Sequence, residues 1–428
     1  MKIFNIIVFV SILDLCANSS FAQIQPWIKL QSPVNVTLRK LSFVDSLTGW
    51  ATGEAGNIIH TTDGGNSWKI QNSPVQTFIT DIFFIDKYLG WAITENDVFP
   101  FNSIILRTTN SGNDWSAENF PDSSKYLKTV FFFDSLNGFV GGSDINYTTD
   151  GGNSWVTADI DSSIYLGFPV RNFIFLNRQQ GYACGGFTDQ AGVIWRTTNS
   201  GFNWLANGVS VDEVLDIHIL DSLNAITLSG DPEGRFPTSD IKTTNAGVSW
   251  SNDTLSFSCL SFAIDFRTYN EGWSASGYQF LTTTNRGELW IEFATPDSAV
   301  IYDLQFTDAR NGYAVGQDGV ILKFDPTLVG AKDNLIPIND FILYQNYPNP
   351  FNPFTKIGFE IADRGFVSLK IYDVLGNEVA TLVHEEKLSG KYEVDFNMDQ
   401  INSFSSGVFF YQLRSEKFTI TKKMIYLK

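Results

Sequence analysis

The chain has 428 residues, of which 43% are hydrophobic, 15% aromatic and only 18% charged, and this composition excludes a disordered polyelectrolyte. The formal net charge of −17 argues against nucleic acid or an anionic membrane as partner, since both require a basic surface. The charge is divided unevenly, because residues 23–336 carry 18 basic and 34 acidic side chains whereas residues 337–428 carry 10 and 11, which indicates two parts of different character.

Residues 1–22 are typical of a secretory signal peptide. Lys2 supplies the positive end, a mostly apolar stretch follows, and Ser20-Phe21-Ala22 forms a small-x-small cleavage site. The apolar run is shorter than the roughly 20 residues that span a bilayer. No later segment qualifies, so the sequence predicts an exported chain without a transmembrane segment.

The mature chain is poor in metal-binding and nucleophilic residues. After the leader only Cys184 and Cys259 remain, and neither a CxxC nor an HExxH pattern occurs. The three histidines stand far apart in the sequence. We therefore expect no metal site and no cofactor.

A repeated octapeptide follows the leader. Six copies have the pattern Thr-Thr-Asp/Asn-x-Gly-x-x-Trp and begin at positions 61, 108, 148, 197, 243 and 283. Before each copy come an apolar run, a polar turn and a Gly-aromatic pair, such as Gly90-Trp91, which is degenerate in the fifth unit (Ala225-Ile226). A seventh unit lacks the octapeptide. Four short strands in 40 to 50 residues make one propeller blade, so we predict an all-β, seven-bladed propeller over residues 23–326.

The last unit provides the means of closing this ring. It stops at residues 321–324 with three strands, whereas residues 26–30 look like the outer strand of every other unit. We expect the N-terminal strand to complete the last blade, which leaves no open sheet edge at the seam.

The octapeptide matches the Asp box of the bacterial-neuraminidase-repeat propellers, and the unit as a whole resembles the photosystem II assembly-factor type of seven-bladed propeller over about residues 24–326. The third residue of each box is expected to bond to amides downstream, and the glycine two residues later to supply a positive φ. The Trp is expected to cap the core between blades. The structural residues are Asp63, Asn110, Asp150, Asn199, Asn245 and Asn285.

The ninth residue before each Gly-aromatic pair is mostly polar and begins each inner strand. Because side chains alternate between the two faces of a strand, this position is expected at the mouth of the central channel. The ring consists of Lys40, Asp81, Thr129, Asn172, Asp216 and Asp303, with Ala263 as its apolar member. It either holds waters, a cation or a polar ligand, or it is a hydrated lining where the inner strands begin.

Two loops between second and third strands are long, at residues 94–103 and 229–239. Both mix carboxylates with Phe and Pro, a composition typical of rigid recognition loops. The candidate contact residues are Glu95, Asp97, Phe99, Phe101, Asp231, Glu233, Arg235 and Phe236. The alternative is a pair of ordinary surface loops with self-packed Phe side chains.

Asp-box propellers include sialidases and xyloglucan-cleaving enzymes, so hydrolysis is an alternative function. This sequence lacks the Phe/Tyr-Arg-Ile-Pro motif of sialidases and has one propeller where the xyloglucan enzymes resemble two in tandem. No catalytic residue is assigned. The carboxylates of the two long loops are the available source of an acid/base pair.

Residues 327–340 predict a linker and residues 341–428 a small Ig-like β-sandwich. Pro348, Pro350 and Pro353 exclude a helix or a regular central strand at its start. Alternating stretches follow at residues 367–372, 392–396, 407–413 and 418–427.

The motifs NYPNPFNP, IYDVLGNEV, LSGKYEV and SSGVFFYQL and a basic end stand in this order between residues 346 and 428. They closely resemble the type A C-terminal sorting domain of the type IX secretion system of Bacteroidota and relatives. The resemblance implies recognition by the outer-membrane translocon, then removal by a sortase-like peptidase with release or surface attachment. The motif residues are Pro348, Asn349, Pro350, Gly376, Lys422 and Lys423.

The sequence thus predicts a secreted or cell-surface propeller that binds a glycan or a protein without catalysis. An Asp-box glycoside hydrolase and a purely structural surface component are the alternatives.

Overall fold

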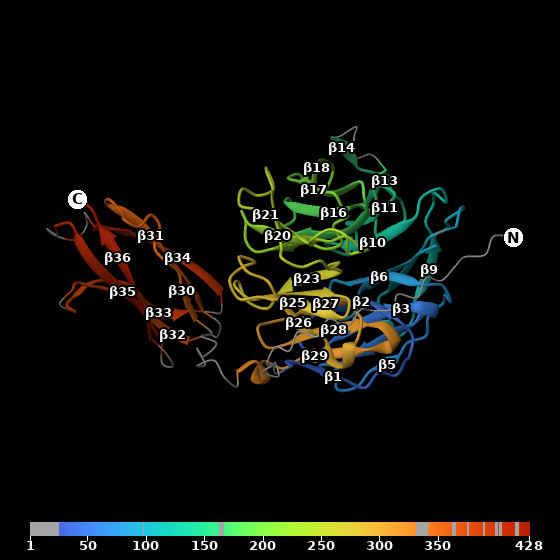
Figure 1. Ribbon diagram of the computed structural model, residues 1–428, viewed down its shortest axis with the longest axis horizontal. Coiled ribbons are helices and arrows are strands. Elements are labelled where there is room, and N and C mark those ends of the chain that lie inside the picture. The colour runs from blue at the N-terminus through green and yellow to red at the C-terminus, as the bar shows by residue number, and fades with distance from the viewer. Residues whose placement is uncertain are drawn as a thin grey trace. The chain divides into compact units, whose positions relative to one another are not determined.

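The computed structural model describes residues 25–428 except Asp97 and residues 162–166, 331–340, 362–364, 375, 388–389, 399–400, 402–404 and 416–418. The chain divides into two compact units, Met1–Ala331 and Lys332–Lys428. The predicted signal peptide and most of the predicted linker lie outside the described residues. Strands form nearly all of the regular structure in both units (Figure 1).

The first three sheets of the first unit contain four strands each, in chain order from the inner to the outer strand. They are β2 (Leu38–Phe43), β3 (Gly49–Gly53), β4 (Ile58–Thr61) and β5 (Lys69–Ile70); then β6 (Ile79–Phe84), β7 (Gly90–Thr94), β8 (Ile104–Thr108) and β9 (Ser116–Asn119); then β10 (Leu127–Phe132), β11 (Gly138–Gly142), β12 (Ile145–Thr148) and β13 (Val156–Thr157).

The fourth sheet gains a fifth strand that the sequence did not indicate. It contains β15 (Val170–Phe175), β16 (Gly181–Phe187), β17 (Ala191–Thr197) and β18 (Asn203–Ser210), and β14 (Asp159–Asp161) pairs parallel to β18. The next two sheets are β19 (His218–Ile219), β20 (Ala225–Ser229), β21 (Ser239–Thr243) and β22 (Ser251–Thr254), and β23 (Ala263–Phe266), β24 (Gly272–Ser276), β25 (Gln279–Thr283) and β26 (Ile291–Ala294).

The last sheet joins the two ends of this unit. It contains β27 (Ile301–Phe306), β28 (Gly312–Gly316) and β29 (Ile321–Phe324), and the N-terminal strand β1 (Trp27–Lys29) pairs antiparallel with β29. Each inner strand contacts the inner strand of the next sheet, and β27 contacts β2, so the sheets form a closed ring. Four short 3-10 segments lie in connections: η1 (Glu54–Gly56), η2 (Pro296–Ser298), η3 (Gln317–Gly319) and η4 (Pro326–Gly330).

One aromatic arrangement recurs where neighbouring sheets meet. Gly90 lies opposite Phe84 in the pairing of β6 with β7, and an added Cβ on this glycine would lie 2.5 Å from the phenyl ring. The other face of Phe84 stacks on Trp50 of the preceding sheet, with ring centroids 3.5 Å apart. Trp115, from the octapeptide, meets the ring edge at 5.8 Å and 86°. Glycine is therefore required because the phenyl ring occupies the place of a side chain.

The same stack joins Trp91 to Phe132, with centroids 3.7 Å apart. Tyr313 of the last sheet stacks on Phe43 of the first at 3.8 Å, which extends the arrangement across the seam of the ring. The degenerate fifth repeat has Ala225 opposite Ile219. Both members of the pair change together, as expected if the glycine exists to make room for the ring.

Hydrogen bonds within each octapeptide hold its turn. In the first copy, Asp63 Oδ1 accepts from the backbone N–H of Ser67 at 2.9 Å, and Thr61 Oγ1 accepts from the N–H of Gly65 at 3.0 Å. The equivalent Asp or Asn oxygen accepts the N–H four residues later in the other five copies. Asn serves as well as Asp, so the turn requires an acceptor oxygen and not a charge.

The second unit contains two sheets. One consists of β30 (Phe341–Leu343), β31 (Phe354–Ile361) and β34 (Gly390–Asn397), and the other of β33 (Glu378–Lys387), β32 (Gly365–Tyr372), β35 (Gly407–Ser415) and β36 (Thr419–Tyr426), in that spatial order. Buried side chains from both sheets, among them Phe359, Leu369 and Tyr411, form one core.

The Gly–Phe contact leads to a stability prediction. Gly90→Ala will lower the free energy of unfolding by about 2 kcal/mol because the added methyl overlaps the Phe84 ring. Combined with Phe84→Ile, it will cost less than the sum of the two single changes, as measured by urea denaturation followed by tryptophan fluorescence. Gly90→Ala with Phe266→Ile, in a distant sheet, is the additive control. Additive costs in both pairs would contradict this explanation of the glycine.

Candidate functional site

The predicted polar ring lies along the central channel. Lys40, Asp81, Asn172, Asp216 and Asp303 line a channel cavity of about 250 Å³. Thr129, the remaining polar member, is buried, 1% exposed. The structure thus brings together residues that are up to 263 positions apart in the sequence.

The carboxylates of this ring connect neighbouring inner strands. Asp303 accepts the backbone N–H of Leu41 at 2.7 Å. Asp81 accepts that of Val130 at 2.8 Å, and Asp216 accepts that of Ile264 at 2.9 Å. Inner strands of different sheets share no ladder, so these side chains satisfy backbone donors that would otherwise lie unpaired beside the channel. This use favours the interpretation of the ring as a structural lining.

Lys40 supplies a cation inside the channel. Its Nζ lies 3.2 Å from Asp303 Oδ1. Burial raises the pKa of Asp303 to about 6, against the opposing effect of Lys40, and burial likewise raises the pKa values of Asp81 and Asp216. Burial also disfavours the Lys40 ammonium, but the three carboxylates outweigh it and raise the pKa of Lys40. One ammonium therefore balances three carboxylates whose charges are costly to bury.

A second ring of side chains lies one residue earlier in each repeat. The register between inner and second strands shifts just before the polar ring, between Leu38 and Lys40, and at the equivalent places in four other sheets. Each shift is a β-bulge, which adds one residue to the inner strand and redirects its side chain. The inserted residues are Arg39, Thr80, Lys128, Arg171 and Tyr302. Leu215 and Phe262 hold the same place in the two sheets where no shift is recorded, and we name the seven residues together the bulge ring.

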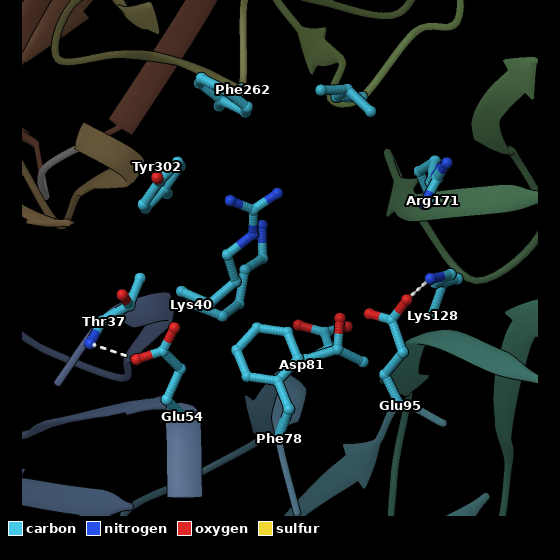
Figure 2. A pocket seen from close by; sticks show the side chains of 13 residues that line it. Thr37, Lys40, Glu54, Phe78, Asp81, Glu95, Lys128, Arg171, Phe262 and Tyr302 are labelled. Atoms are coloured by element: carbon cyan, nitrogen blue, oxygen red, sulfur yellow. Dashed lines mark hydrogen bonds and ion pairs between the residues drawn. The ribbon is translucent and has the colours of Figure 1, made fainter. Parts of the chain in front are cut away.

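All seven members of the bulge ring line one cavity of about 390 Å³, which we name the mouth pocket. Lys40 and Asp81 line both this pocket and the channel cavity, so the two are continuous. Figure 2 shows Phe262 and Tyr302 on one side of the pocket, across from Lys128 and Arg171.

Arg39 is held by aromatic rings and not by a carboxylate. Its guanidinium lies 4.3 Å from the ring centroid of Tyr302 and 5.3 Å from that of Phe262. Burial lowers the pKa of Arg39, and the nearby Arg171 acts in the same direction. Within the described residues, no hydrogen-bond acceptor is recorded for this guanidinium, whose donors are suited to a planar carboxylate.

The other two cations have acidic neighbours. Lys128 forms an ion pair with Glu95, and Arg171 forms one with Glu213, with Nη2 2.7 Å from a carboxylate oxygen. Burial, together with the charges of Arg171 and Arg39, lowers the pKa of Lys128 to about 8. The three cations therefore repel one another, and an anion in the pocket would relieve that repulsion.

The loop at residues 94–103 borders the mouth pocket. Glu95 lines the pocket, Asp97 lies outside the described residues, and Phe99 is 70% exposed. Phe99 meets Phe101 at 6.0 Å, and Phe101 meets Tyr126 at 5.2 Å, each edge to face. This aromatic series extends the site outward from the neighbourhood of Lys128.

The loop at residues 229–239 does not border the mouth pocket. Asp231 is 2% exposed and accepts the backbone N–H groups of Glu233, Arg235 and Phe236, which folds the loop. Arg235 pairs with Asp189 at 2.9 Å and with Glu233 at 3.1 Å. Of the four predicted contact residues, Phe236 lines a cavity, which is distinct from the mouth pocket. The two long loops therefore do not form one binding face.

Sequence reasoning missed the bulge ring. Simple alternation points Arg39, Lys128 and Arg171 away from the face of the polar ring, and only the bulge redirects them. A signal was nevertheless present, since the tenth residue before the Gly-aromatic pair is basic in three of seven repeats.

The sorting-motif residues cover the edge of the last strand of the second unit. Asn349 Oδ1 accepts the N–H of Ile425 at 2.9 Å, and Phe351 exchanges backbone hydrogen bonds with Ile425 and Leu427. Pro348 provides its carbonyl to Thr355 Oγ1 at 2.9 Å. Pro350 lies within this covering segment, Gly376 adopts φ +83° in a turn, and Lys422 and Lys423 lie on β36. The motif thus covers part of an edge strand that would otherwise be open to pairing.

Two family models match parts of the chain, one in each unit. A family model described as a secretion system C-terminal sorting domain matches residues 345–427. A second, described as the photosynthesis system II assembly factor YCF48, matches residues 66–218. The sorting domain marks the protein as one that the type IX secretion system delivers to the cell surface or the medium. Among the described residues, no helix is long and apolar enough to cross a membrane.

Individual relatives agree with these families. The chloroplastic photosystem II stability/assembly factor HCF136 of Oryza sativa subsp. japonica is 34% identical over 64 residues, which is 14% of this chain and 15% of that protein. A structure of YCF48 bound to D1 peptide has a TM-score of 0.55 at 19% identity, covering 70% of this chain and 97% of that chain. PorZ, a surface component of the type IX secretion system of Porphyromonas gingivalis, has a TM-score of 0.50 at 14% identity, covering 91% of this chain and 59% of that chain. At these identities the likeness shows the propeller fold.

The channel charges lead to a second stability prediction. Lys40→Met will destabilise the propeller by about 3 kcal/mol at pH 7, because it removes the cation that balances buried carboxylates. The loss will be smaller at pH 5, where carboxylates of raised pKa, such as Asp303 at about 6, become protonated and neutral. Urea denaturation at both pH values measures this difference.

Lys29→Met is the matched control, because the pair between Lys29 and Asp297 is exposed and its loss should change little. Equal effects of the two substitutions, or an effect of Lys40→Met that does not depend on pH, would contradict the assignment.

Proposed function

We propose that this chain is an exported seven-bladed propeller, closed by its N-terminal strand, whose mouth pocket binds an acidic segment of a protein partner. The observation that carries this proposal is the convergence of Arg39, Lys128 and Arg171 in one cavity at the channel mouth. Of these, Arg39 is presented on aromatic rings without a carboxylate partner among the described residues.

A cluster of basic side chains is unexpected in this part of the chain, because acidic residues predominate there. Residues 23–336 carry 34 acidic and 18 basic side chains, yet Arg39, Lys128 and Arg171 gather with Lys40 in a pocket of about 390 Å³, whose lining also includes the carboxylates of Glu54, Asp81 and Glu95. Lys128 and Arg171 are paired with Glu95 and Glu213, but Arg39 has no carboxylate partner among the described residues, so its partial burial beside other cations is costly in the absence of a further anion. A cluster of this kind is therefore best explained by binding, in which carboxylates of the partner neutralise it.

The surroundings of the cations favour a peptide over an inorganic anion. Phe262 and Tyr302 border Arg39, and the series Phe99, Phe101 and Tyr126 extends from the other side of the pocket. Such surfaces bury apolar side chains that flank an acidic residue. YCF48, which shares the fold, has been solved with a D1 peptide bound, and this supports a peptide ligand for the propeller here.

The sorting domain suggests how the binding module reaches its place of action. We expect recognition of residues 341–428 by the type IX translocon, and cleavage by a sortase-like peptidase near residues 327–345. The propeller would then act at the cell surface or in the medium, as PorZ is a surface component in its own organism.

The glycosidase alternative finds less support. Glu95 is paired with Lys128, whereas Asp231 folds its own loop and lines neither the mouth pocket nor the channel cavity. An acid/base pair needs two carboxylates on one substrate, and no pair of the predicted loop carboxylates shares a cavity within the described residues.

Peptide binding tests the proposal. A labelled library of short peptides, with Asp or Glu flanked by Phe or Tyr, should bind the purified full chain saturably and more weakly as salt is added. Arg39→Ala should weaken binding by roughly tenfold or more, the effect of losing a charged hydrogen bond. Arg178→Ala, which removes an exposed arginine outside the pocket, is the control. Equal binding of a matched library with Asn and Gln in place of the acids would refute the proposal.

The same pocket predicts a dependence on pH. As the pH rises through about 8, Lys128 loses its charge, so affinity for the acidic peptides should fall between pH 7 and pH 9. Lys128→Arg should remove most of this dependence, because arginine stays protonated throughout the range. Fluorescence anisotropy titrations at both pH values measure it, and an unchanged pH profile in the variant would count against a role for Lys128.

A further inference from the structure

A second large cavity lies apart from the mouth pocket. It has a volume of about 610 Å³ and lies between the sheet that contains β18 and the sheet that contains β21 and β22. None of its lining residues lines the mouth pocket or the channel cavity. We name it the lateral groove, and we propose that it binds an uncharged carbohydrate chain.

The polar lining of the lateral groove is almost entirely neutral. Six lining side chains carry an uncharged hydroxyl or amide: Gln190, Ser210, Ser229, Ser239, Asn252 and Thr254. No lysine, arginine or histidine lines the groove, and Asp212 is its one carboxylate. Neutral donors and acceptors of this kind match the hydroxyl groups of a sugar, whereas an anionic ligand would find no cation here.

Several of these polar side chains have donors or acceptors that a ligand could use. In the part of the chain that the structure describes, the side chains of Gln190, Ser239 and Thr254 have no recorded hydrogen bond to protein atoms. Asn252 Nδ2 donates to the carbonyl of Val209 at 2.8 Å, a bond that joins the two sheets and fixes the amide group. The donors and acceptors therefore come from both walls of the groove.

An aromatic ring stands at the edge of the groove in a preformed position. Phe236 is 56% exposed although its own backbone N–H is held by the buried carboxylate of Asp231 at 3.2 Å. The neighbouring Arg235 is anchored to Asp189 by hydrogen bonds of 2.9 and 3.0 Å. A loop fixed in this way presents the phenyl ring at a smaller entropic cost than a mobile loop would. The apolar C–H face of a sugar ring can pack on that surface while its hydroxyls reach the neutral lining.

This assignment gives the loop at residues 229–239 a role of its own. Asp231 and Arg235 are positioning residues that hold the loop, and Phe236 is the contact residue. The lateral groove is independent of the mouth pocket, so one chain would present a neutral glycan site and an acidic-peptide site. Such a protein would connect a partner protein to a surface polysaccharide.

The test uses the purified full chain and neutral disaccharides. Cellobiose, maltose, lactose and diacetylchitobiose are titrated by calorimetry and saturation-transfer NMR, with glucuronic acid as the charged comparison. At least one neutral disaccharide should bind saturably, and Phe236→Ala should weaken it by roughly tenfold. Phe236→Trp, which retains an aromatic surface, should keep the affinity within about threefold, a difference of under 1 kcal/mol.

Two further variants separate this site from the mouth pocket. Phe99→Ala removes a phenylalanine on the other long loop that is even more exposed than Phe236, and Arg39→Ala disables the mouth pocket. Both variants should bind the disaccharide as the unmodified chain does. Asn252→Ala should weaken binding and provides a second variant if Phe236→Ala proves unstable in thermal denaturation. The proposal is overturned if no neutral disaccharide binds, if glucuronic acid or the acidic peptides bind better at this groove, or if Phe236→Ala and Phe99→Ala behave alike.

Discussion

Flat packing of a phenylalanine between a glycine and the aromatic side chain of the neighbouring sheet is the interaction on which the ring depends. Phe84 illustrates it: Gly90 leaves room on one face, Trp50 stacks on the other, and Trp115 closes the edge. The sheets of the ring share no backbone ladder beyond isolated contacts such as the Gly277–Ile301 bridge, so side chains supply most of what joins them. Tyr313 on Phe43 carries the same packing across the seam, where β1 completes the last sheet.

Joining the sheets through side chains leaves backbone N–H groups without a partner along the central channel. Inner strands lie side by side without pairing, and their backbone N–H groups need acceptors. Asp81, Asp216 and Asp303 provide these acceptors, at the cost of burying carboxylates whose pKa values rise as a result. Lys40 offsets part of that cost. Residues that look in the sequence like a ligand-binding ring are thus needed by the fold itself.

The β-bulges create positions on the inner strands whose side chains are not needed to hold the sheets together. In five sheets, one inserted residue near the start of the inner strand is released from the alternation of the strand and lines the mouth pocket. Arg39, Lys128 and Arg171 occupy such positions, and no ladder or core contact requires a cation there. Because these positions are not needed for the fold, their residues can differ between repeats and can serve in binding. The lateral groove shows the same division between structural and binding residues: Asp231 fixes the loop, and Phe236 remains free to contact a ligand.

The sequence by itself determined the repeat, most of its strands, the Asp-box turns and the sorting domain, because each rests on contacts between residues close in the chain. Gly90 with Phe84, or Asp63 with Ser67, can be recognised without knowing where the next sheet lies. Only the tertiary structure decided which side chains meet at the channel mouth. Alternation along a strand pointed to Lys40 and Asp81, whereas the bulges brought forward Arg39, Lys128 and Arg171, and a bulge depends on how two strands pair. Likewise, residues 94–103 and 229–239 look alike in composition, yet one borders the mouth pocket and the other the lateral groove. Their separation follows from the closure of the ring, which fixes the position of every sheet through packing between residues far apart in the chain.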